Sequence, residues 1–313
     1  MNPNCDLICI GMALIDSIIR GFDPEPVSAS GYRAVSGSLH VGGEAVNEAV
    51  TAAKLGVKTG ILCALGPDEA GNLVEQTLAG NGVDISHIVR SGEHSTPVTT
   101  LFVRDDGSRK SITNEAHRWN FHPERDLTIL EHAKGIILGS LFRAPFDDPD
   151  VIAAVLGEAK KRGITVFADT KLPNFRFLTL EDIRDCLPLI DYITPNEDEA
   201  RYFTKKEDPG QMADVFLSYG VRNVIIKLGG KGCYFHNAEG AVTLPALDIH
   251  AVDATGAGDN FVAGFASEIL RGSSDKDALR FANACGAICA SEVGALTGVK
   301  SRMQVLELLR TLQ

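Results

Sequence analysis

Short runs of apolar and β-branched residues alternate along this chain with longer amphipathic segments. Six such runs predict buried strands, at residues 6–11, 58–65, 134–140, 163–169, 191–195 and 221–229. Between them, residues 44–56 and 149–163 carry apolar side chains at helical spacing. Strands that alternate with helices in this way predict an α/β fold, with a doubly wound, mostly parallel sheet covered by helices on both faces.

Two regions depart from this alternation. Residues 31–41 and 96–114 read as extended, partly polar strands, and Asp105-Asp106-Gly107 is a hairpin signal within the second region. We expect these regions to form a small β-sheet that covers a ligand site as a lid, built from discontinuous segments at roughly 17–41 and 96–114. Because no linker, repeat or low-complexity tract interrupts residues 1–313, we expect a single domain.

Composition narrows the class of protein. The chain has 313 residues, 44% of them hydrophobic, and a formal net charge of −11 at pH 7. A sizeable core is therefore expected, and the acidic balance argues against a nucleic-acid or anionic-membrane partner. No apolar run reaches the ~18 residues of a membrane span, and no basic leader precedes Asp16. These features predict a cytoplasmic protein that binds a small molecule.

The seven cysteines are scattered, and no Cys-x-x-Cys pair occurs. A disulfide framework or a zinc site would need paired spacing. We expect the cysteines to act as small buried side chains.

The segment VDATGAGDNF, residues 252–261, places glycines at the predicted start of a helix. The residues that follow have apolar side chains at four-residue spacing, which predicts a helix ending near Gly272. Gly256, Ala257 and Gly258 would then lie in the first turn, where backbone N–H groups have no helical partner. Together with the helix dipole, these N–H groups make an anion site.

Asp259 would lie in the same first turn, next to the bound anion. This arrangement suits phosphoryl transfer, because the N–H groups stabilise charge on the moving phosphoryl group while Asp259 accepts the proton of an attacking hydroxyl. The alternative is that Asp259 is only a favourable charge at a helix start and that the glycines only form a tight turn. The local pattern leaves both interpretations open.

Four motifs in order extend the argument to the whole chain. They are Gly42-Gly43 followed by Asn47, then Asn196 with Glu199, then KLGGKG at 227–232, and then DATGAGD at 253–259. This series resembles the PfkB, or ribokinase-like, family of carbohydrate and nucleoside kinases. The resemblance implies a doubly wound α/β domain with a β-sheet lid, and ATP and Mg²⁺ as cofactors. It also implies Asp259 as the base beside an anion hole of Gly256, Ala257 and Gly258, and a homodimer that pairs through the lid.

The resemblance also implies a sugar site. Asp16, Gly42, Gly43 and Asn47 are similar to the family's sugar-contacting positions. A carboxylate at Asp16 can accept hydrogen bonds from two hydroxyls, the glycines let the backbone approach the sugar, and Asn47 can both donate and accept. The alternative is a helix N-cap at Asp16 and a lid hinge at the glycine pair.

Further positions resemble the family's nucleotide and metal sites. Asn196 and Glu199 resemble an N-x-x-E pair that organises Mg²⁺ through water, and their spacing would place both on one helix face. Three positions resemble the nucleotide loop: Lys227, Gly229 and Gly232.

Two departures from the family pattern concern charge and cation binding. Asp253 and Thr255 resemble the residues that hold a monovalent cation, K⁺, and Thr255 also adjoins the nucleotide, but Ala254 stands where relatives carry Thr, Ser or Pro. Lys171 stands where many sugar kinases have Asn, and a lysine there could reach a phosphate as a point charge. Arg176 is displaced from the family's arginine and is equally consistent with a surface position.

The leading hypothesis is therefore an ATP-dependent phosphotransferase that acts on a primary hydroxyl of a sugar or sugar derivative. A nucleoside kinase of the same family is one alternative, and a non-catalytic sugar- or nucleotide-sensing protein is another. An NAD-linked dehydrogenase would need Gly-x-Gly-x-x-Gly after the first strand, where this chain has GMALID, and no Walker motif occurs.

Overall fold

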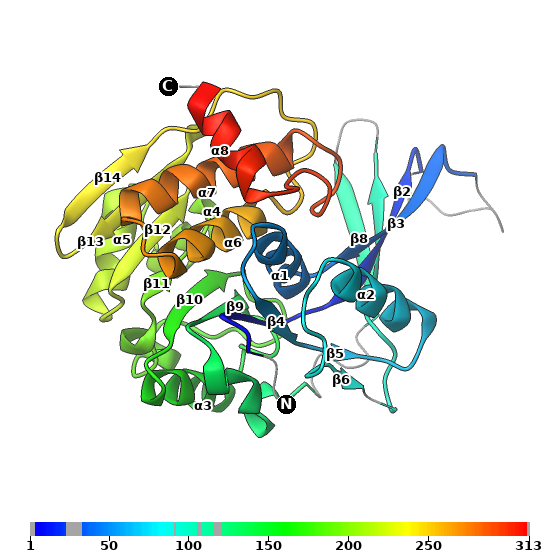
Figure 1. The fold of residues 1–313 in the computed structure, drawn as a ribbon, viewed down its shortest axis with the longest axis horizontal. Coiled ribbons are helices and arrows are strands. Elements are labelled where there is room, and N and C mark those ends of the chain that lie inside the picture. Colours follow the sequence, from blue (N-terminus) through cyan, green and yellow to red (C-terminus); the bar gives the residue numbers. More distant parts are fainter. Residues whose placement is uncertain (1–3, 23–32, 91, 105–107, 115–120, 312–313) are drawn as a thin grey trace.

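The computed structural model describes residues 4–22, 33–90, 92–104, 108–114 and 121–311, and an eight-stranded sheet forms its centre (Figure 1). In spatial order its strands are β14 (Gly240–Leu244), β13 (Cys233–Asn237), β12 (Asn223–Lys227), β11 (Tyr192–Ile193), β10 (Thr165–Thr170), β9 (Gly135–Leu141), β1 (Leu7–Ile10) and β4 (Thr59–Leu62). Pairing is parallel from β12 through to β4 and antiparallel at β12–β13 and β13–β14. The mostly parallel sheet predicted from the sequence is confirmed.

All six predicted strands are present, although most are shorter than their apolar runs. The run at 58–65 divides after Leu62, and its last residues form β5 (Ala64–Leu65), which pairs with β6 (Val89–Arg90). Eight α-helices occur in the described chain: α1 (Glu44–Lys54), α2 (Glu69–Gly80), α3 (Pro149–Lys161), α4 (Glu197–Thr204), α5 (Pro209–Ser218), α6 (Ala257–Leu270), α7 (Asp275–Ala290) and α8 (Arg302–Thr311). Short 3₁₀ helices lie at Pro123–Arg125, Thr128–His132, Glu181–Ile183, Leu187–Leu189 and Gly229–Lys231.

The strands bury side chains on both faces, which explains their continuous apolar runs. In β1, Ile8 and Ile10 pack with residues of α3, α4 and α5, whereas Leu7 and Cys9 pack with residues of α1, α2, α6 and α7. The small side chains of Ala45, Ala49 and Ala52 on α1 are fully buried, which allows the helix to pack closely. Helix α8 packs on the outer side of α7 (Figure 1). Within the described residues, no helix is both long enough and apolar enough to cross a bilayer.

A separate four-stranded sheet, here called the lid sheet, stands at one side of the molecule (Figure 1). Its strands in order are β3 (Ser36–Gly42), β2 (Leu14–Arg20), β7 (Val98–Val103) and β8 (Arg109–Thr113). Both predicted lid regions contribute strands, but the sheet begins at Leu14, before residue 17. Strand β2 starts only a few residues after β1, and the predicted apolar run at 6–11 covers β1 alone. Residues 23–32 and 105–107 of the predicted lid segments lie outside the described residues.

Candidate active site

Helix α6 begins at a glycine whose backbone conformation other residues rarely adopt. Gly256 occupies the N-cap position with a φ of 76°. A Cβ atom at this position would lie 2.2 Å from the Cβ atom of Ala295. Both the positive φ and this close approach require glycine. The first turn of α6 is thereby held against the loop that contains Ala295.

Two of the three predicted anion-hole amides are free to bind a ligand. Among the described residues, the N–H groups of Gly256 and Gly258 have no protein acceptor, whereas the N–H group of Ala257 donates to the carbonyl oxygen of Ala254 at 3.2 Å. Free N–H groups at the positive end of a helix dipole attract an anion. The start of α6 therefore has the form of an anion site.

Asp259 lies one residue beyond these amides and is almost completely buried, with 7% of its surface exposed. Its Oδ2 atom accepts a hydrogen bond of 2.7 Å from Nδ2 of Asn47, a residue of α1. Burial raises the pKa of Asp259 to about 6, and the positive charge of Lys171 opposes this shift. A carboxylate with this pKa is deprotonated at neutral pH and basic enough to accept a proton from a hydroxyl.

Lys171 follows β10 directly, at the carboxyl end of the sheet, and forms an ion pair with Glu44. The Nζ atom lies 3.2 Å from Oε1 of Glu44, the first residue of α1. The Lys171 charge reaches Asp259, as its effect on the pKa of that carboxyl shows. The structure thus brings this predicted phosphate ligand close to the predicted base.

Lys227 ends β12, as predicted, and also lies beside the start of α6. A Cβ atom on Gly258 would be 3.4 Å from the Nζ atom of Lys227. The same Nζ atom donates to Oδ1 of Asp169 at 2.5 Å, and the hydroxyl of Thr194 donates to this oxygen at 2.9 Å. Lys227 is therefore a cation held in a fixed position next to the anion site.

A pocket of about 500 Å³ connects the loop after β12 with the first turn of α6. Lys227, Gly229 and Gly230 line one side of the pocket, and Ala257 and Gly258 line its end. This volume is typical of small-molecule sites. The remaining wall is largely apolar and includes Ala246, Leu247, Ile249, Ala251, Phe261, Gly286, Ala287 and Ala290. The volume and the mixed polar and apolar lining of this pocket suit a nucleotide.

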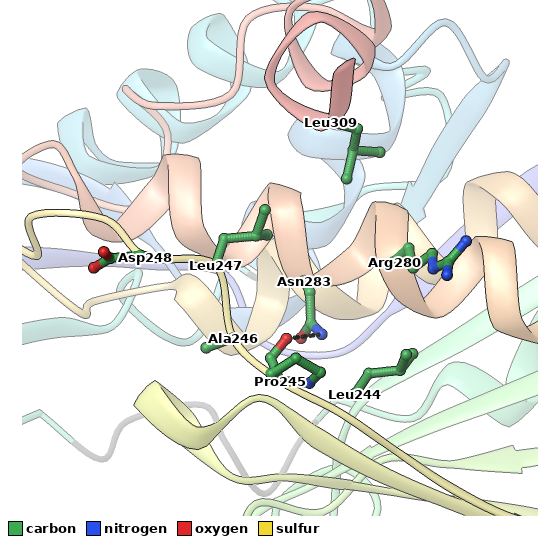
Figure 2. Close-up of a pocket in the computed structure, with 8 residues that line it drawn as sticks. All are labelled: Leu244, Pro245, Ala246, Leu247, Asp248, Arg280, Asn283 and Leu309. Atoms are coloured by element: carbon green, nitrogen blue, oxygen red, sulfur yellow. Dashed lines mark hydrogen bonds between the residues drawn. The ribbon is translucent and has the colours of Figure 1, made fainter. Parts of the chain in front are cut away.

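A second pocket of about 630 Å³ (Figure 2) adjoins the first, since Ala246, Leu247, Asp248 and Asn283 line both. In Figure 2 the side chain of Asn283 points from α7 toward Pro245, and its Nδ2 atom donates to the carbonyl oxygen of Pro245 at 3.3 Å. Asn283 borders both pockets. The second pocket includes neither the glycine loop nor the start of α6, so the phosphate-binding features belong to the first.

The glycines of the KLGGKG loop have different roles. Gly229 and Gly230 face open space in the pocket, because a Cβ atom on either would meet no atom within 4 Å. Gly232 has a φ of 100°, and a Cβ atom there would lie 2.0 Å from the carbonyl oxygen of Leu244. Gly232, which resembles a position of the nucleotide loop, thus allows the close approach of its own chain at Leu244. Lys231 extends into solvent.

The profile of the pfkB family carbohydrate kinases matches residues 6–302, nearly the whole chain. The chain belongs to the PfkB family. The family identified from the four motifs is therefore confirmed, and the mostly parallel sheet with a separate small sheet is the fold of its solved members.

Individual PfkB-family proteins align with most of the chain. Ribokinase of Haemophilus influenzae is 29% identical over 276 residues, which cover 86% of this chain and 87% of that protein. The ATP-dependent ribose-1-phosphate kinase of Halopiger xanaduensis is 33% identical over 257 residues, 81% of each chain. The structure of Arabidopsis thaliana ribokinase complexed with ribose and ATP superposes with a TM-score of 0.86 at 26% identity and covers 98% of this chain and 99% of the other.

In this PfkB-family chain, Gly42 and Gly43 of the predicted sugar site lie where a side chain would clash with neighbouring atoms. Asp16 lies within strand β2 of the lid sheet, not at a helix N-cap. A Cβ atom on Gly42 would lie 2.7 Å from Oδ2 of Asp16, so Gly42 leaves room for that carboxylate. Gly43 is the N-cap of α1 with a φ of 100°, and a Cβ atom there would lie 2.4 Å from the carbonyl oxygen of Met12. The glycine pair thus lets β3 turn directly into α1 beside Asp16.

Asn196 and Glu199 form a capping box at the start of α4, so they do not simply share a helix face. Oδ1 of Asn196 accepts from the N–H group of Glu199 at 2.9 Å, and Oε2 of Glu199 accepts from the N–H group of Asn196 at 2.9 Å. The hydroxyl of Thr170 also donates to Oε2 of Glu199 at 2.8 Å. Burial raises the pKa of Glu199, and the charge of Lys227 opposes this effect. The pair is rigid and lies close to the candidate site.

Asp253, one of the two residues predicted to bind a monovalent cation, joins its own segment to the loop after α7. Its Oδ1 atom accepts from the backbone and the hydroxyl of Thr255, at 3.0 and 2.7 Å, and its Oδ2 atom accepts from the N–H group of Gly294 at 3.0 Å. The loop of residues 291–295 is therefore fixed against the segment that precedes α6.

Sequence reasoning passed over two residues that hold this site together. Asn260 donates from Nδ2 to the carbonyl oxygens of Gly256 and Ala295, both at 2.9 Å, and accepts from the hydroxyl of Thr51 on α1 at 3.0 Å. Glu44 pairs with Lys171 across the sheet. Both residues could have been found from their places in the sequence, because Asn260 directly follows the predicted base Asp259 and Glu44 directly follows the predicted sugar-site glycines.

Arg176, whose position the sequence left open, is half exposed and donates to Oδ2 of Asp148 at 2.6 Å. Asp148 is the N-cap of α3 and belongs to the opposite helix layer from α6. The structure places Arg176 with α3 and not with the anion site.

Proposed function

We propose that this PfkB-family carbohydrate kinase transfers the γ-phosphoryl group of ATP to a primary hydroxyl of a sugar or sugar derivative, with Asp259 as the base. One observation carries the proposal: the buried carboxyl of Asp259, with a pKa of about 6, lies next to free backbone N–H groups at the end of a nucleotide-sized pocket. A base and an anion site in this order are what an in-line phosphoryl transfer requires.

In the proposed step, the acceptor oxygen forms a bond to the γ-phosphorus while the bond to the β,γ-bridging oxygen breaks. The electron pair of that broken bond stays on ADP, and the hydroxyl proton passes to Asp259. The N–H groups of Gly256 and Gly258 donate to the phosphoryl oxygens as their charge rises. The amide of Asn47 keeps Oδ2 of Asp259 in place, so that Oδ1 can face the acceptor.

The charged residues around this site also support the proposed cations. Mg²⁺, when bound with the nucleotide, would neutralise phosphate charge, and it commonly keeps several waters and few protein ligands. Asn196 and Glu199 would hold those waters, as their fixed position at the start of α4 allows. Asp253 and Thr255 are the proposed support for K⁺, because the carboxylate of Asp253 orders both segments next to the anion site.

A hydroxyl-rich acceptor is proposed for the space between the lid sheet and α6. Asp16 on β2 offers a carboxylate and Asn47 on α1 an amide whose Oδ1 atom is buried with no protein partner among the described residues. Such groups suit a monosaccharide or sugar acid better than a purine, and the similar proteins named above are a ribokinase and a ribose-1-phosphate kinase. A nucleoside kinase and a non-catalytic sensor are the alternatives to be tested.

The test is ADP release from ATP and Mg²⁺, with and without K⁺, in the presence of ketoses, aldoses, sugar acids and nucleosides. We expect release that depends on a sugar or sugar acid, and a higher rate with K⁺. Release only with nucleosides would replace the proposed acceptor class. Binding of ATP and a sugar without any ADP release would favour the sensor.

The activity should fall on acidification with a midpoint near pH 6. Burial raises the pKa of Asp259 to about 6, and only its carboxylate form accepts the proton. Below that pH, kcat/KM should fall tenfold per pH unit, because it follows the deprotonated fraction of the free enzyme. The measurement is kcat/KM between pH 4.5 and 8.5 at constant ionic strength. An acid limb near pH 4, the ordinary range of aspartate, would contradict the assignment of the base.

We also propose a homodimer that pairs through the lid sheet. Strands β3 and β8 are the two edges of this sheet, and they expose Leu39 and Ile112, with 64% and 67% of their surfaces accessible. Exposed apolar edge strands are usually covered. Light scattering after size-exclusion chromatography should give twice the mass of the chain, and the double variant Leu39→Lys, Ile112→Lys should elute as a monomer.

A further inference from the structure

The ion pair between Lys171 and Glu44 lies at the mouth of the site, not in the core. The side chains of Lys171 and Glu44 retain 29% and 19% of their exposure. The backbone of Lys171 is fixed, because its N–H group donates to the carbonyl oxygen of Leu141 at 3.0 Å. The position of the ion pair at the carboxyl ends of β9 and β10 therefore points to a role in the reaction.

The site has an excess of carboxyl groups. Besides Asp259, four of them surround it from α1, from the end of β10 and from α4: Glu44, Glu48, Asp169 and Glu199. The cations nearby are Lys171 and Lys227, and Lys227 is already bound to Asp169. A transferring phosphoryl group adds further negative charge to this cluster. Lys171 is the cation placed to offset the negative charge of the phosphoryl group. Its ammonium group has three N–H donors and Glu44 occupies one of them, so donors remain for phosphoryl oxygens.

Glu48 is the fully buried carboxyl group among these four residues. Neither of its carboxyl oxygens has a hydrogen-bond partner in the described part of the chain. Burial, together with the charges of Asp169 and Asp259, raises its pKa well above the ordinary value and so opposes its ionisation. Lys171 and Glu44, which pair with each other, are the two charged groups that act most strongly on the pKa of Asp259.

We propose that Lys171 is a catalytic residue that donates to the transferring phosphoryl group beside Asp259, and that Glu44 is the positioning residue that holds its ammonium group there. This inference rests on the proposed kinase function. As the oxygen–phosphorus bond to the acceptor forms and the bond to the bridging oxygen breaks, Lys171 faces the phosphoryl oxygens while Asp259 takes the hydroxyl proton. The residue after β10 thus completes the anion site from the side opposite α6.

The two members of the pair should have opposite effects on the base. Lys171 lowers the pKa of Asp259 and Glu44 raises it, with Asp169 acting in the same direction as Glu44 and Asn47 in the same direction as Lys171. From α7, Cys289 also faces Asp259, but its thiol is neutral because burial raises its pKa to about 12. Removing Lys171 should therefore move the acid limb of kcat/KM to higher pH, and neutralising Glu44 should move it to lower pH.

The experiment compares Lys171→Met, Lys171→Arg and Glu44→Gln with the wild type in ADP release, using the best acceptor and Mg²⁺-ATP. Lys171→Met should lower kcat about 10²–10³-fold, the loss typical of one donor to a transition-state anion. Lys171→Arg should recover part of that loss, because it restores a positive charge. Lys134→Met is the matched control: Lys134 pairs with Asp6 at 2.8 Å at the opposite, amino end of β9, and its variant should keep the wild-type rate and pH profile.

Opposite shifts of the acid limb in Lys171→Met and Glu44→Gln, together with the loss in kcat, support the inference. Wild-type kcat in Lys171→Met overturns it, and so do acid limbs that stay in place or move in the same direction in both variants. If a thermal melt shows that Lys171→Met does not fold, two other results decide. A shift of the acid limb of kcat/KM to lower pH in Glu44→Gln, with a reduced kcat in Lys171→Arg, supports the inference, and the absence of both overturns it. A wild type that releases no ADP with any acceptor overturns the proposed function itself, which is a different result.

Discussion

Replacing Asp259 with asparagine should lower kcat for ADP release by about 10²–10⁴-fold, the usual contribution of a general base. The variant keeps the shape of the side chain, and its amide oxygen can still accept the hydrogen bond from Nδ2 of Asn47. Folding should not suffer, because the raised pKa means that ionisation of Asp259 opposes folding as pH rises from the ordinary aspartate range through about 6. The measurements are steady-state ADP release, ATP binding by calorimetry and a thermal melt.

A control for this variant exists in the next helix. Asp277 is the third residue of α7, as Asp259 is of α6, but its side chain is 66% exposed. Asp277→Asn should leave both kcat and ATP affinity unchanged, since it removes a charge from the same helical position at a residue that does not line the pocket. Full turnover in Asp259→Asn would disprove its role as the base. Loss of ATP binding along with turnover would point to a structural role instead.

Gly256→Ala should lower kcat by about 10²–10³-fold, because the added methyl group forces the first turn of α6 away from Ala295. The N–H groups of Gly256 and Gly258 would then no longer point at one phosphoryl position. A left-handed backbone also costs a non-glycine residue about 1–2 kcal/mol. The measurements compare the variant with the wild type in kcat for ADP release and in the free energy of unfolding in urea.

Gly272→Ala separates the two effects. Gly272 follows the other end of α6, with a φ of 86° like the 76° of Gly256, but a Cβ atom there would meet nothing within 4 Å. It should therefore lose similar stability from backbone strain and keep the wild-type kcat. If Gly256→Ala also kept its kcat, the close contact with Ala295 would not be what shapes the anion site.

Local pattern was sufficient for much of the architecture. Apolar runs predicted the strands because a parallel strand covered on both faces needs apolar side chains at every position, as Ile8 and Cys9 illustrate by packing on opposite sides of β1. The start of α6 was equally predictable, since Gly256 and the apolar spacing that follows are local features. Strand β2 was not predicted as a strand of its own, and only its residues from 17 on fell within the expected lid segment.

The sequence by itself determined the fold class, the family and the glycine-rich start of α6, because each depends on periodicity or on residues that are neighbours in the chain. Tertiary structure alone decided which charges act together. Glu44 meets Lys171, and Asn47 meets Asp259, across separations of more than one hundred residues, because α1, β10 and α6 converge at the carboxyl edge of the sheet. The strength of a base depends on burial and on charges from such distant segments, and no local pattern records them.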